Sequence, residues 1–262
     1  MTDKPSLYGC KAKLERAEQN IINLASEIKS LMAEDVNGRI PSHDGDVFED
    51  TVKPFVSQNV PPRLSVLVGE CIHNLRSCLD QSVWQLILAN GRTPSEQTCF
   101  PIYTFNPATS SDKRALKRYC GAIEGVSPAV KTIIDGLQPH IPRNGGHGNA
   151  LAIIHALNIA DKHHDLLTIR RVACRESYTT SEKTVAVPSG NPVYDFSEID
   201  ENGTKTVFHY GGESPVYVNS KVTQQITLIH SGADALEPVI EALWQLWWAV
   251  RYVVADFELY FE

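Results

Sequence analysis

The chain has 262 residues, of which 42% are hydrophobic, and a formal net charge of −7 at pH 7. This length and apolar content are sufficient for a full buried core and argue against a disordered chain. The acidic balance argues against broad binding of nucleic acid or anionic lipid, because both attract a clustered positive surface. Nucleic-acid binding through a local basic groove stays open but is not favoured.

The N-terminal segment has no apolar signal-peptide core, and no stretch reaches the roughly 18 uninterrupted apolar residues of a membrane-spanning helix. We therefore expect a cytoplasmic protein that does not enter a membrane. The six cysteines include no CxxC pair, which indicates reduced thiols rather than a disulfide framework or a zinc site. Cys71 and Cys78 fit buried thiols best, because they fall on the apolar side of a predicted helix.

Helical periodicity dominates the first part of the chain. Apolar residues recur at intervals of three and four from Ser6 to about Ala33, which predicts a long amphipathic helix. Residues 35–62 are rich in Gly and Pro and predict a loop with a short strand around 47–56. A second helix is expected to begin at Pro61-Pro62 and to end at Asn90-Gly91. Further helices are predicted over 111–120, 128–137 and 149–164, with an apolar, irregular segment at 99–103 that closes over the edge of a core.

The composition changes after residue 165. Segments rich in Val, Ile, Thr and Tyr alternate with turn residues, as strands do; they cover residues 166–174, 184–187, 204–210 and 216–228. Asn202-Gly203 is a typical hairpin turn. Residues 234–258 predict a helix that is apolar around most of its circumference, which implies burial inside the bundle or in a subunit interface.

These elements predict an α+β fold: a helical bundle with an antiparallel β-sheet section inserted before a returning C-terminal helix. We expect a single domain over residues 1–262. Its parts are a mainly helical part at 1–165, a β-rich section at 166–231 and a C-terminal helix at 232–262 that packs back on the bundle.

The second predicted helix has two chemically different faces. At about 100° of rotation per residue, one sector is apolar and the opposite sector is polar. His, Asn, Arg, Ser and Asp close to a Trp are typical of a partly buried hydrogen-bonded network rather than a solvated face. The polar sector contains Glu70, His73, Asn74, Arg76, Ser77, Asp80 and Gln81. A second polar stretch, with Asn158, Asp161, Lys162 and His163, lies on the predicted helix at 149–164.

One interpretation is architectural. Hydrogen bonds from the first polar stretch to Asn158, Asp161 and His163 would hold two helices in register in a binding or assembly protein. Asn74, Ser77, Asn158, Asp161 and Lys162 are then the candidate ligand-binding residues.

The alternative is a hydrolase that uses the same residues. His moves a proton, and Arg stabilises the negative charge that develops on a phosphorane. The candidate catalytic residues are His73, Arg76, Asp80 and His163.

A metal-dependent hydrolase is a variant of this alternative. Glu70 and His73 have the spacing of Glu-x-x-His ligands on one helix face. Asp80 is equally well placed to pair with Arg76, four residues away. No metal site is therefore favoured, and no cofactor is expected.

Four motifs occur in a fixed order: Gly69 to Asp80, Phe100-Pro101-Ile102, Leu137-Gln138-Pro139 and Asp161-Lys162-His163. Their combination resembles a group of poorly characterised bacterial and phage-associated helical proteins. The resemblance covers residues 7–170 and implies a helical architecture without a defined activity.

A weaker likeness is to the HEPN nucleases, helical proteins that cleave RNA without a metal, using an Arg and a His at a dimer interface. Arg76 with His73 or His163 would supply these groups. No Arg in this sequence is followed by a His at the spacing of the HEPN motif. A homodimer is expected, with the Trp-rich C-terminal helix as one surface for it, and the ligand or substrate is not predicted.

Overall fold

The structure is a computed structural model that describes residues 4–36, 60–141, 147–163, 166–167, 169–179, 196–199, 205–208, 218–228 and 237–261. The chain divides into two compact units. The first unit consists of Met1–Glu27, Pro61–Ile169 and Leu228–Glu262, and the second of Ile28–Val60 and Arg170–Thr227.

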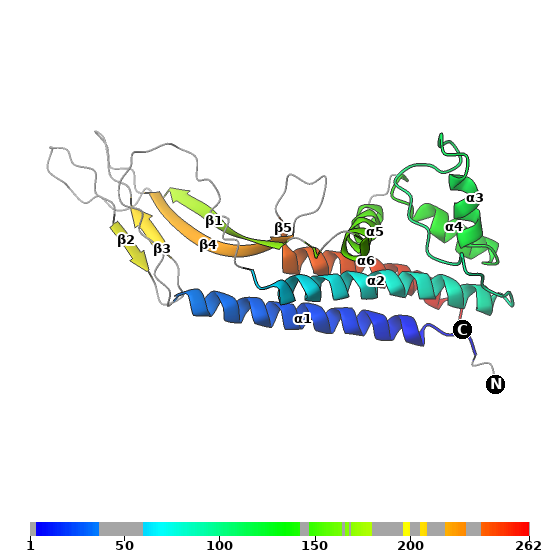
Figure 1. Ribbon diagram of the computed structural model, residues 1–262, viewed down its shortest axis with the longest axis horizontal. Coiled ribbons are helices and arrows are strands. Elements are labelled where there is room, and N and C mark those ends of the chain that lie inside the picture. Colours follow the sequence, from blue (N-terminus) through cyan, green and yellow to red (C-terminus); the bar gives the residue numbers. More distant parts are fainter. Residues whose placement is uncertain are drawn as a thin grey trace. The chain divides into compact units, whose positions relative to one another are not determined.

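Six helices occur in the part of the chain that the structure describes (Figure 1). They are α1 (Tyr8–Val36), α2 (Pro62–Ala89), α3 (Ala115–Ala122), α4 (Pro128–Gly136), α5 (His147–His163) and α6 (Val239–Glu258). Each covers most of a segment for which the sequence predicts a helix, so the helix predictions are confirmed.

Local sequence explains where α2 begins and ends. Pro62 occupies the first turn, where the fixed φ of proline suits a helix and its missing N–H removes no hydrogen bond. Asn90 caps the other end, and Gly91 follows with a φ of 67°, a left-handed conformation that glycine adopts without strain. These signals make α2 a single uninterrupted helix across the polar residues of interest.

The core of the first unit is built from helices. α2 contacts both α5 and α6, and α5 also contacts α6. The indole N–H of Trp247 on α6 donates to the carbonyl of Leu14 on α1 at 3.0 Å. α6 therefore packs against helices from the beginning of the chain. Fully buried side chains in this core include Ile72, Leu75, Leu79, Leu151, Ile154, Val250, Val253 and Val254.

Burial inside the bundle accounts for only part of the surface of α6. Trp248 is 52% exposed and Tyr252 is 55% exposed. The two rings lie 6.2 Å apart, and Trp248 also packs edge-on against Trp247. For these exposed side chains, burial in a subunit interface stays a prediction.

The predicted α+β class is wrong, because the described part of the chain is mostly helical, and among its residues no sheet forms a layer of the first unit. Extended segments occur at β1 (Ile169–Thr179), β2 (Phe196–Ile199), β3 (Lys205–Phe208), β4 (Val218–Leu228) and β5 (Glu237–Pro238). β2 pairs antiparallel with β3, and β3 with β4; Phe196 lies opposite Phe208, and Thr206 opposite Lys221. Most of these residues belong to the second unit.

The physical reason for this error is that β-branched residues favour extended backbone, whereas packing decides whether extended segments form a layer of a core. The strands predicted at 47–56 and 184–187 and the turn at Asn202-Gly203 lie outside the described residues.

Within the described residues, no helix is both long enough and apolar enough to span a membrane. Cys71 and Cys78 are buried and free, as the sequence predicts. Cys10 on α1 is also buried and free.

Candidate functional site

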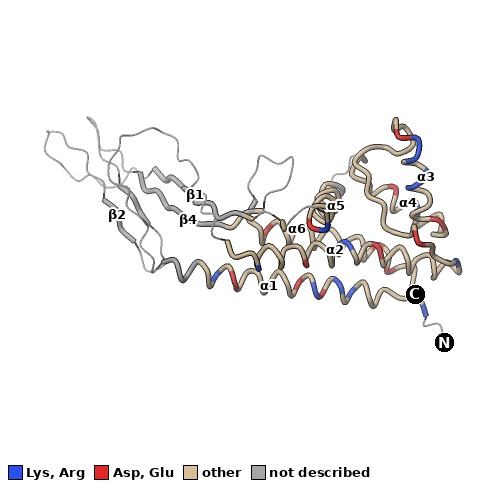
Figure 2. The backbone as a smooth tube through the Cα atoms, in the orientation of Figure 1, with Lys and Arg blue, Asp and Glu red and all other residues tan. Residues whose placement is uncertain are grey.

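One side of α2 faces α5. Gly69, His73, Arg76 and Asp80 recur at intervals of four, three and four residues and therefore share a face of the helix. A Cβ atom built on Gly69 would overlap the carboxylate of Asp161 on α5, with the Asp161 Cγ only 2.9 Å away. Glycine at position 69 thus leaves room for the Asp161 side chain. Figure 2 shows acidic and basic residues where α5 lies beside α2.

Arg76 is the polar centre of this face. The residue is only 8% exposed, and its Nη2 donates to Asp80 Oδ1 at 2.7 Å and to the Phe100 carbonyl at 2.6 Å. The Phe100 N–H donates to the same Asp80 oxygen at 2.9 Å. The Phe100 ring is fully buried and lies 6.5 Å from the ring of Phe257 on α6. Arg76 and Asp80 therefore attach the irregular segment at 99–103 to α2.

Two buried nitrogen atoms close to this centre have no hydrogen-bond partner: Nη1 of Arg76 and Nδ1 of His155 on α5. Burial lowers the pKa of His155, and the nearby positive charge of Arg76 lowers it further, against the opposing effect of Asp80. His155 therefore lies within electrostatic reach of the Arg76–Asp80 pair. A buried donor without an acceptor costs about 1–3 kcal/mol, so such an atom calls for an explanation.

Burial and neighbouring charges shift the pKa of two further groups around this centre, Asp80 and His73. Burial raises the pKa of Asp80, while Arg76 and the Phe100 N–H act in the opposite direction. Burial also lowers the pKa of His73, and the positive charges of Lys162 and Lys13 lower it further.

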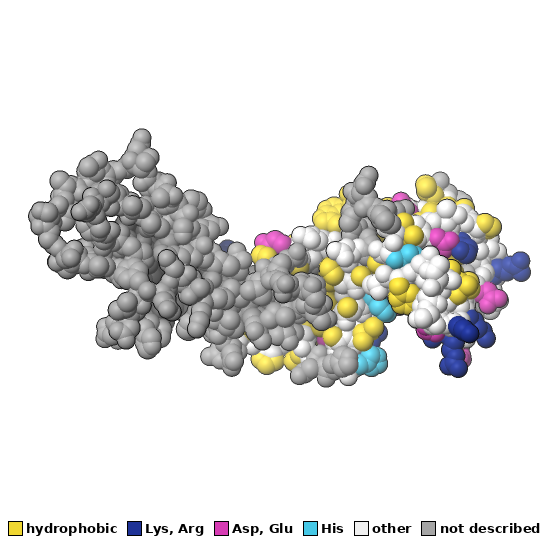
Figure 3. Space-filling view, turned by 90° about the horizontal axis from the view of Figure 1, so that it is seen from above, with side chains coloured by type: hydrophobic (Ala, Val, Ile, Leu, Met, Phe, Trp, Pro, Cys, Tyr) yellow, Lys and Arg dark blue, Asp and Glu magenta, His cyan; other side chains and the backbone are white. Residues whose placement is uncertain are grey.

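We call Arg76, Asp80, His155, His73, Asp161 and Lys162 the polar seam. Its His73 and Lys162 members are exposed. Figure 3 shows histidine side chains among hydrophobic ones on one face of the molecule.

The other predicted site residues have separate surroundings. Asn74 is buried, and its Nδ2 donates to the Glu70 carbonyl at 2.8 Å. Asn158 is buried, Ser77 is half-buried, and His163 at the end of α5 is exposed. The expected hydrogen bonds from α2 to Asn158, Asp161 and His163 are not found among the described residues. Arg76 and Asn74 bond to α2 itself and to Phe100 instead.

The structure also shows the surroundings of Glu70, one of the two predicted metal ligands. Glu70 is exposed and accepts a hydrogen bond from Asn20 Nδ2 on α1 at 3.2 Å. No group of three or more His, Cys, Asp or Glu side chains suited to a metal ion is found in the described part of the chain. Glu70 is thus engaged with α1.

Sequence reasoning missed two members of the site. His155 precedes Asn158 by three residues and Lys162 by seven, so the helical repeat alone places it on the polar side of α5. The Phe100 carbonyl has no such signal, because a backbone acceptor in an irregular segment is independent of side-chain identity.

Searches against models of protein families, curated proteins and solved structures find no match. The resemblance to bacterial and phage-associated helical proteins and the weaker likeness to HEPN nucleases therefore stay predictions.

Proposed function

We propose that the chain is a binding or assembly protein, and that the polar seam binds an oxyanion group of its ligand, either a carboxylate or a phosphate. The observation that carries the proposal is the buried Nη1 of Arg76, which has no partner while Nη2 of the same guanidinium has two. Guanidinium N–H groups form a rigid fork that matches the oxygens of carboxylates and phosphates.

Two features of the seam support an oxyanion as the ligand. His155 Nδ1 is buried and unpartnered, and a neutral imidazole can donate from this nitrogen to the same oxyanion. Lys162 is exposed and close enough to influence both His73 and Asp80. Its charge adds attraction for an anion, because Asp80 already neutralises Arg76.

Isothermal titration calorimetry of the full chain with inorganic phosphate, and separately with acetate, tests the proposal and distinguishes the two oxyanions. We expect binding of at least one of them. The Lys162→Ala variant is expected to bind about 2–5-fold more weakly, the usual effect of an exposed charge. Lys117→Ala on α3 removes the same charge from an exposed position outside the seam and should leave the affinity unchanged.

Arg76→Lys gives a sharper test, because lysine keeps the charge and loses the fork. We expect this variant to lose at least about tenfold in affinity, with folding checked by circular dichroism. The proposal fails if neither anion binds the wild-type chain, or if the Lys162 and Lys117 variants weaken binding equally.

The hydrolase alternative and the homodimer stay predictions. No observation on the described residues favours hydrolysis, and an RNA-cleavage assay of the wild-type, Arg76→Ala and His163→Ala chains would test it directly. For a homodimer, the exposed Trp248 and Tyr252 side chains of α6 are the most direct surface. Light scattering coupled to size exclusion measures the oligomeric state.

A further inference from the structure

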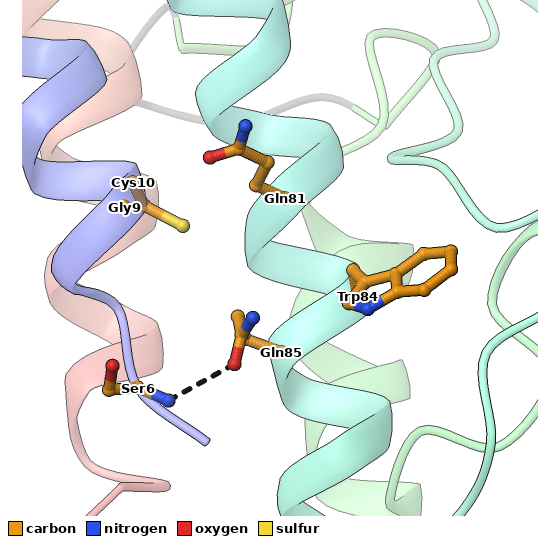
Figure 4. A pocket seen from close by; sticks show the side chains of 6 residues that line it. All are labelled: Ser6, Gly9, Cys10, Gln81, Trp84 and Gln85. Atoms are coloured by element: carbon orange, nitrogen blue, oxygen red, sulfur yellow. Dashed lines mark hydrogen bonds between the residues drawn. The ribbon is translucent and has the colours of Figure 1, made fainter. Parts of the chain in front are cut away.

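The pocket between the start of α1 and the second half of α2 is small and is lined by residues without a formal charge. Its volume is about 70 Å³, and its lining consists of Ser6, Gly9, Cys10, Gln81, Trp84 and Gln85 (Figure 4). The Ser6 N–H donates to Gln85 Oε1 at 3.1 Å. A space of this size holds a few water molecules. A dense group of charges lies instead on α3 and in the turn before it.

Four basic residues fall within six positions at the start of α3. They are Lys113, Arg114, Lys117 and Arg118, and all four are exposed. Figure 2 shows these basic positions on α3 and just before it. Arg118 pairs with Asp112, the one acidic residue between positions 112 and 118. The other three cations have no ion-pair partner among the residues that the structure describes.

This arrangement of charges disfavours the helix that carries it. Lys113 and Lys117 are four residues apart, as are Arg114 and Arg118, so that like charges are neighbours on the helix surface. Positive charge is also unfavourable at a helix N-terminus, where the unpaired N–H groups are themselves positive. No acidic residue occupies the first turn of α3. Asp112 accepts a hydrogen bond from the Arg114 N–H at 2.9 Å, but one carboxylate offsets only part of four positive charges. An anionic partner would relieve this repulsion.

Apolar side chains are exposed close to these cations. Leu116 and Phe105 are each 44% exposed. Leu116 precedes Tyr119 by three residues, so the two share one side of α3. The Tyr119 ring lies 5.7 Å from the Tyr103 ring, which in turn lies 5.4 Å from the Phe105 ring. Two ring contacts therefore connect the exposed Phe105 side chain to α3.

Buried contacts hold the backbone beneath this surface. Ala115 is fully buried, Tyr119 is 5% exposed, and the Tyr119 hydroxyl donates to Asp135 Oδ1 on α4 at 2.6 Å. The Tyr103 N–H donates to Oε1 of Gln138, a buried residue, at 3.1 Å. A ligand that binds here meets an ordered backbone, which lowers the entropic cost of binding.

We propose that this surface, the α3 patch, binds an acidic peptide segment of a protein partner that carries apolar side chains among its carboxylates. The α3 patch consists of Phe105, Lys113, Arg114, Leu116, Lys117 and Arg118. Carboxylates of the peptide pair with Lys113, Arg114 and Lys117. Its apolar side chains cover Leu116 and Phe105.

Single-stranded nucleic acid fits the α3 patch less well than such a peptide. Nucleic acid stacks successive bases on exposed aromatic rings, and Phe105 is the one ring of the patch that is classed as exposed. Leu116 supplies an apolar contact without a ring face. The net charge of −7 also repels a polyanion more strongly than a short peptide.

Fluorescence anisotropy of two labelled peptides with the full chain tests the proposal. The Glu-Leu peptide has leucines between its glutamates, and the Glu-Ser peptide has serine in place of each leucine. We expect both to bind, the Glu-Leu peptide more tightly. Raising NaCl from about 50 to about 300 mM should weaken both, because salt screens exposed charges.

Lys117→Glu is expected to weaken binding of the Glu-Leu peptide by about 3–10-fold, because repulsion replaces an exposed ion pair. Arg16→Glu on α1 is the matched control, since it makes the same change in net charge at another exposed position and should leave the affinity unchanged. Leu116→Ser should weaken the Glu-Leu peptide by about 2–3-fold and leave the Glu-Ser peptide unaffected. All three side chains are exposed, so these changes should not disturb the fold.

Absence of binding by the Glu-Leu peptide would overturn the proposal. Equal weakening in Lys117→Glu and Arg16→Glu would also do so, because it would show a general effect of net charge. A single-stranded oligothymidine that binds more tightly than the Glu-Leu peptide, and loses affinity in Lys117→Glu, would assign the patch to nucleic acid instead. Loss of peptide binding in Lys162→Ala but not in Lys117→Glu would place the peptide at the polar seam, and would overturn this proposal while leaving the oxyanion proposal intact.

Discussion

Arg76 combines a structural role with an unsatisfied atom. Its Nη2 joins α2 to the Phe100 carbonyl and to Asp80, while Nη1 is buried without a partner. Replacing both members of a buried ion pair with apolar groups often leaves the stability unchanged. Removing only one member is destabilising, because the other charge is then buried without a partner. The energetic consequence of a change at Arg76 therefore depends on whether Asp80 is changed with it.

Arg76→Ala is expected to destabilise the fold by about 3 kcal/mol, the lower end of the range for breaking a buried pair, because the Asp80 side chain is 35% exposed. Urea unfolding monitored by circular dichroism measures the loss. The double variant Arg76→Ala, Asp80→Ala should be more stable than the sum of the single changes predicts. Arg118→Ala breaks the exposed pair with Asp112 and should have little effect. Equal effects at Arg76 and Arg118 would contradict this prediction.

His155 should make the stability depend on pH. Burial and Arg76 lower its pKa in the folded chain below the ordinary value of 6.5. The unfolded chain therefore binds a proton at a pH where the folded chain does not, and the free energy of unfolding falls as the pH drops below about 6.5. The contribution of His155 to the free energy of unfolding is fully present above that pH.

His155→Gln is expected to flatten this dependence in urea titrations between pH 7.5 and about 5, since glutamine does not titrate there. His73, whose pKa is also lowered, contributes in the same direction in both proteins and cancels from the difference. The raised pKa of Asp80 stabilises the fold at low pH, and this contribution is lost as the pH rises from about 3.8. It is present in both proteins and therefore also cancels from the difference between them. The control is His163→Gln, at an exposed position of the same helix. An unchanged slope in His155→Gln would rule out the inferred environment.

The contact between α2 and α5 depends on the absence of a side chain at residue 69. In an ordinary helix interior, Gly→Ala stabilises by up to about 1 kcal/mol. A methyl group on Gly69 would overlap the Asp161 carboxylate, which must then move away. The contact with the Asp161 side chain thus opposes helix propensity at this position.

Gly69→Ala should therefore be destabilising in the wild-type chain and stabilising in an Asp161→Ala background. We expect a coupling free energy of about 1 kcal/mol or more in the double-mutant cycle, measured by urea unfolding. Gly9→Ala on α1 is the control, because its Cβ would meet Gln81 Oε1 at an ordinary 3.4 Å. It should be neutral or stabilising. Additive effects at 69 and 161 would show that the two residues are not in contact.

The helices could be predicted from the sequence because their signals are local. Apolar spacing, Pro62 at the start of α2 and Gly91 after its end are all properties of neighbouring residues. The pairing of Arg76 with Asp80 could also be predicted, because the two residues are four apart on one helix. The bond from Arg76 to the Phe100 carbonyl could not, since it joins positions 24 residues apart. The α+β class failed for a similar reason: β propensity is local, whereas membership of a core layer is not.

The first unit is assembled from distant parts of the chain. Its helices come from residues before 28, between 61 and 169, and after 228. The second unit is formed by the intervening residues, 28–60 and 170–227. All four Trp residues, at positions 84, 244, 247 and 248, belong to the first unit. Tryptophan fluorescence therefore reports on this unit alone.

Two compact units in one chain are expected to unfold at different denaturant concentrations, because cooperative units coincide with separately packed groups of elements. Hydrogen exchange of backbone amides, measured by mass spectrometry at increasing urea, resolves them. The amides of β2, β3 and residues 218–227 should lose protection together, at a urea concentration different from that of α2 and α6. The loss in α2 and α6 should coincide with the fluorescence transition, since both lie in the first unit. A single transition for all these segments would instead support one cooperative domain over residues 1–262.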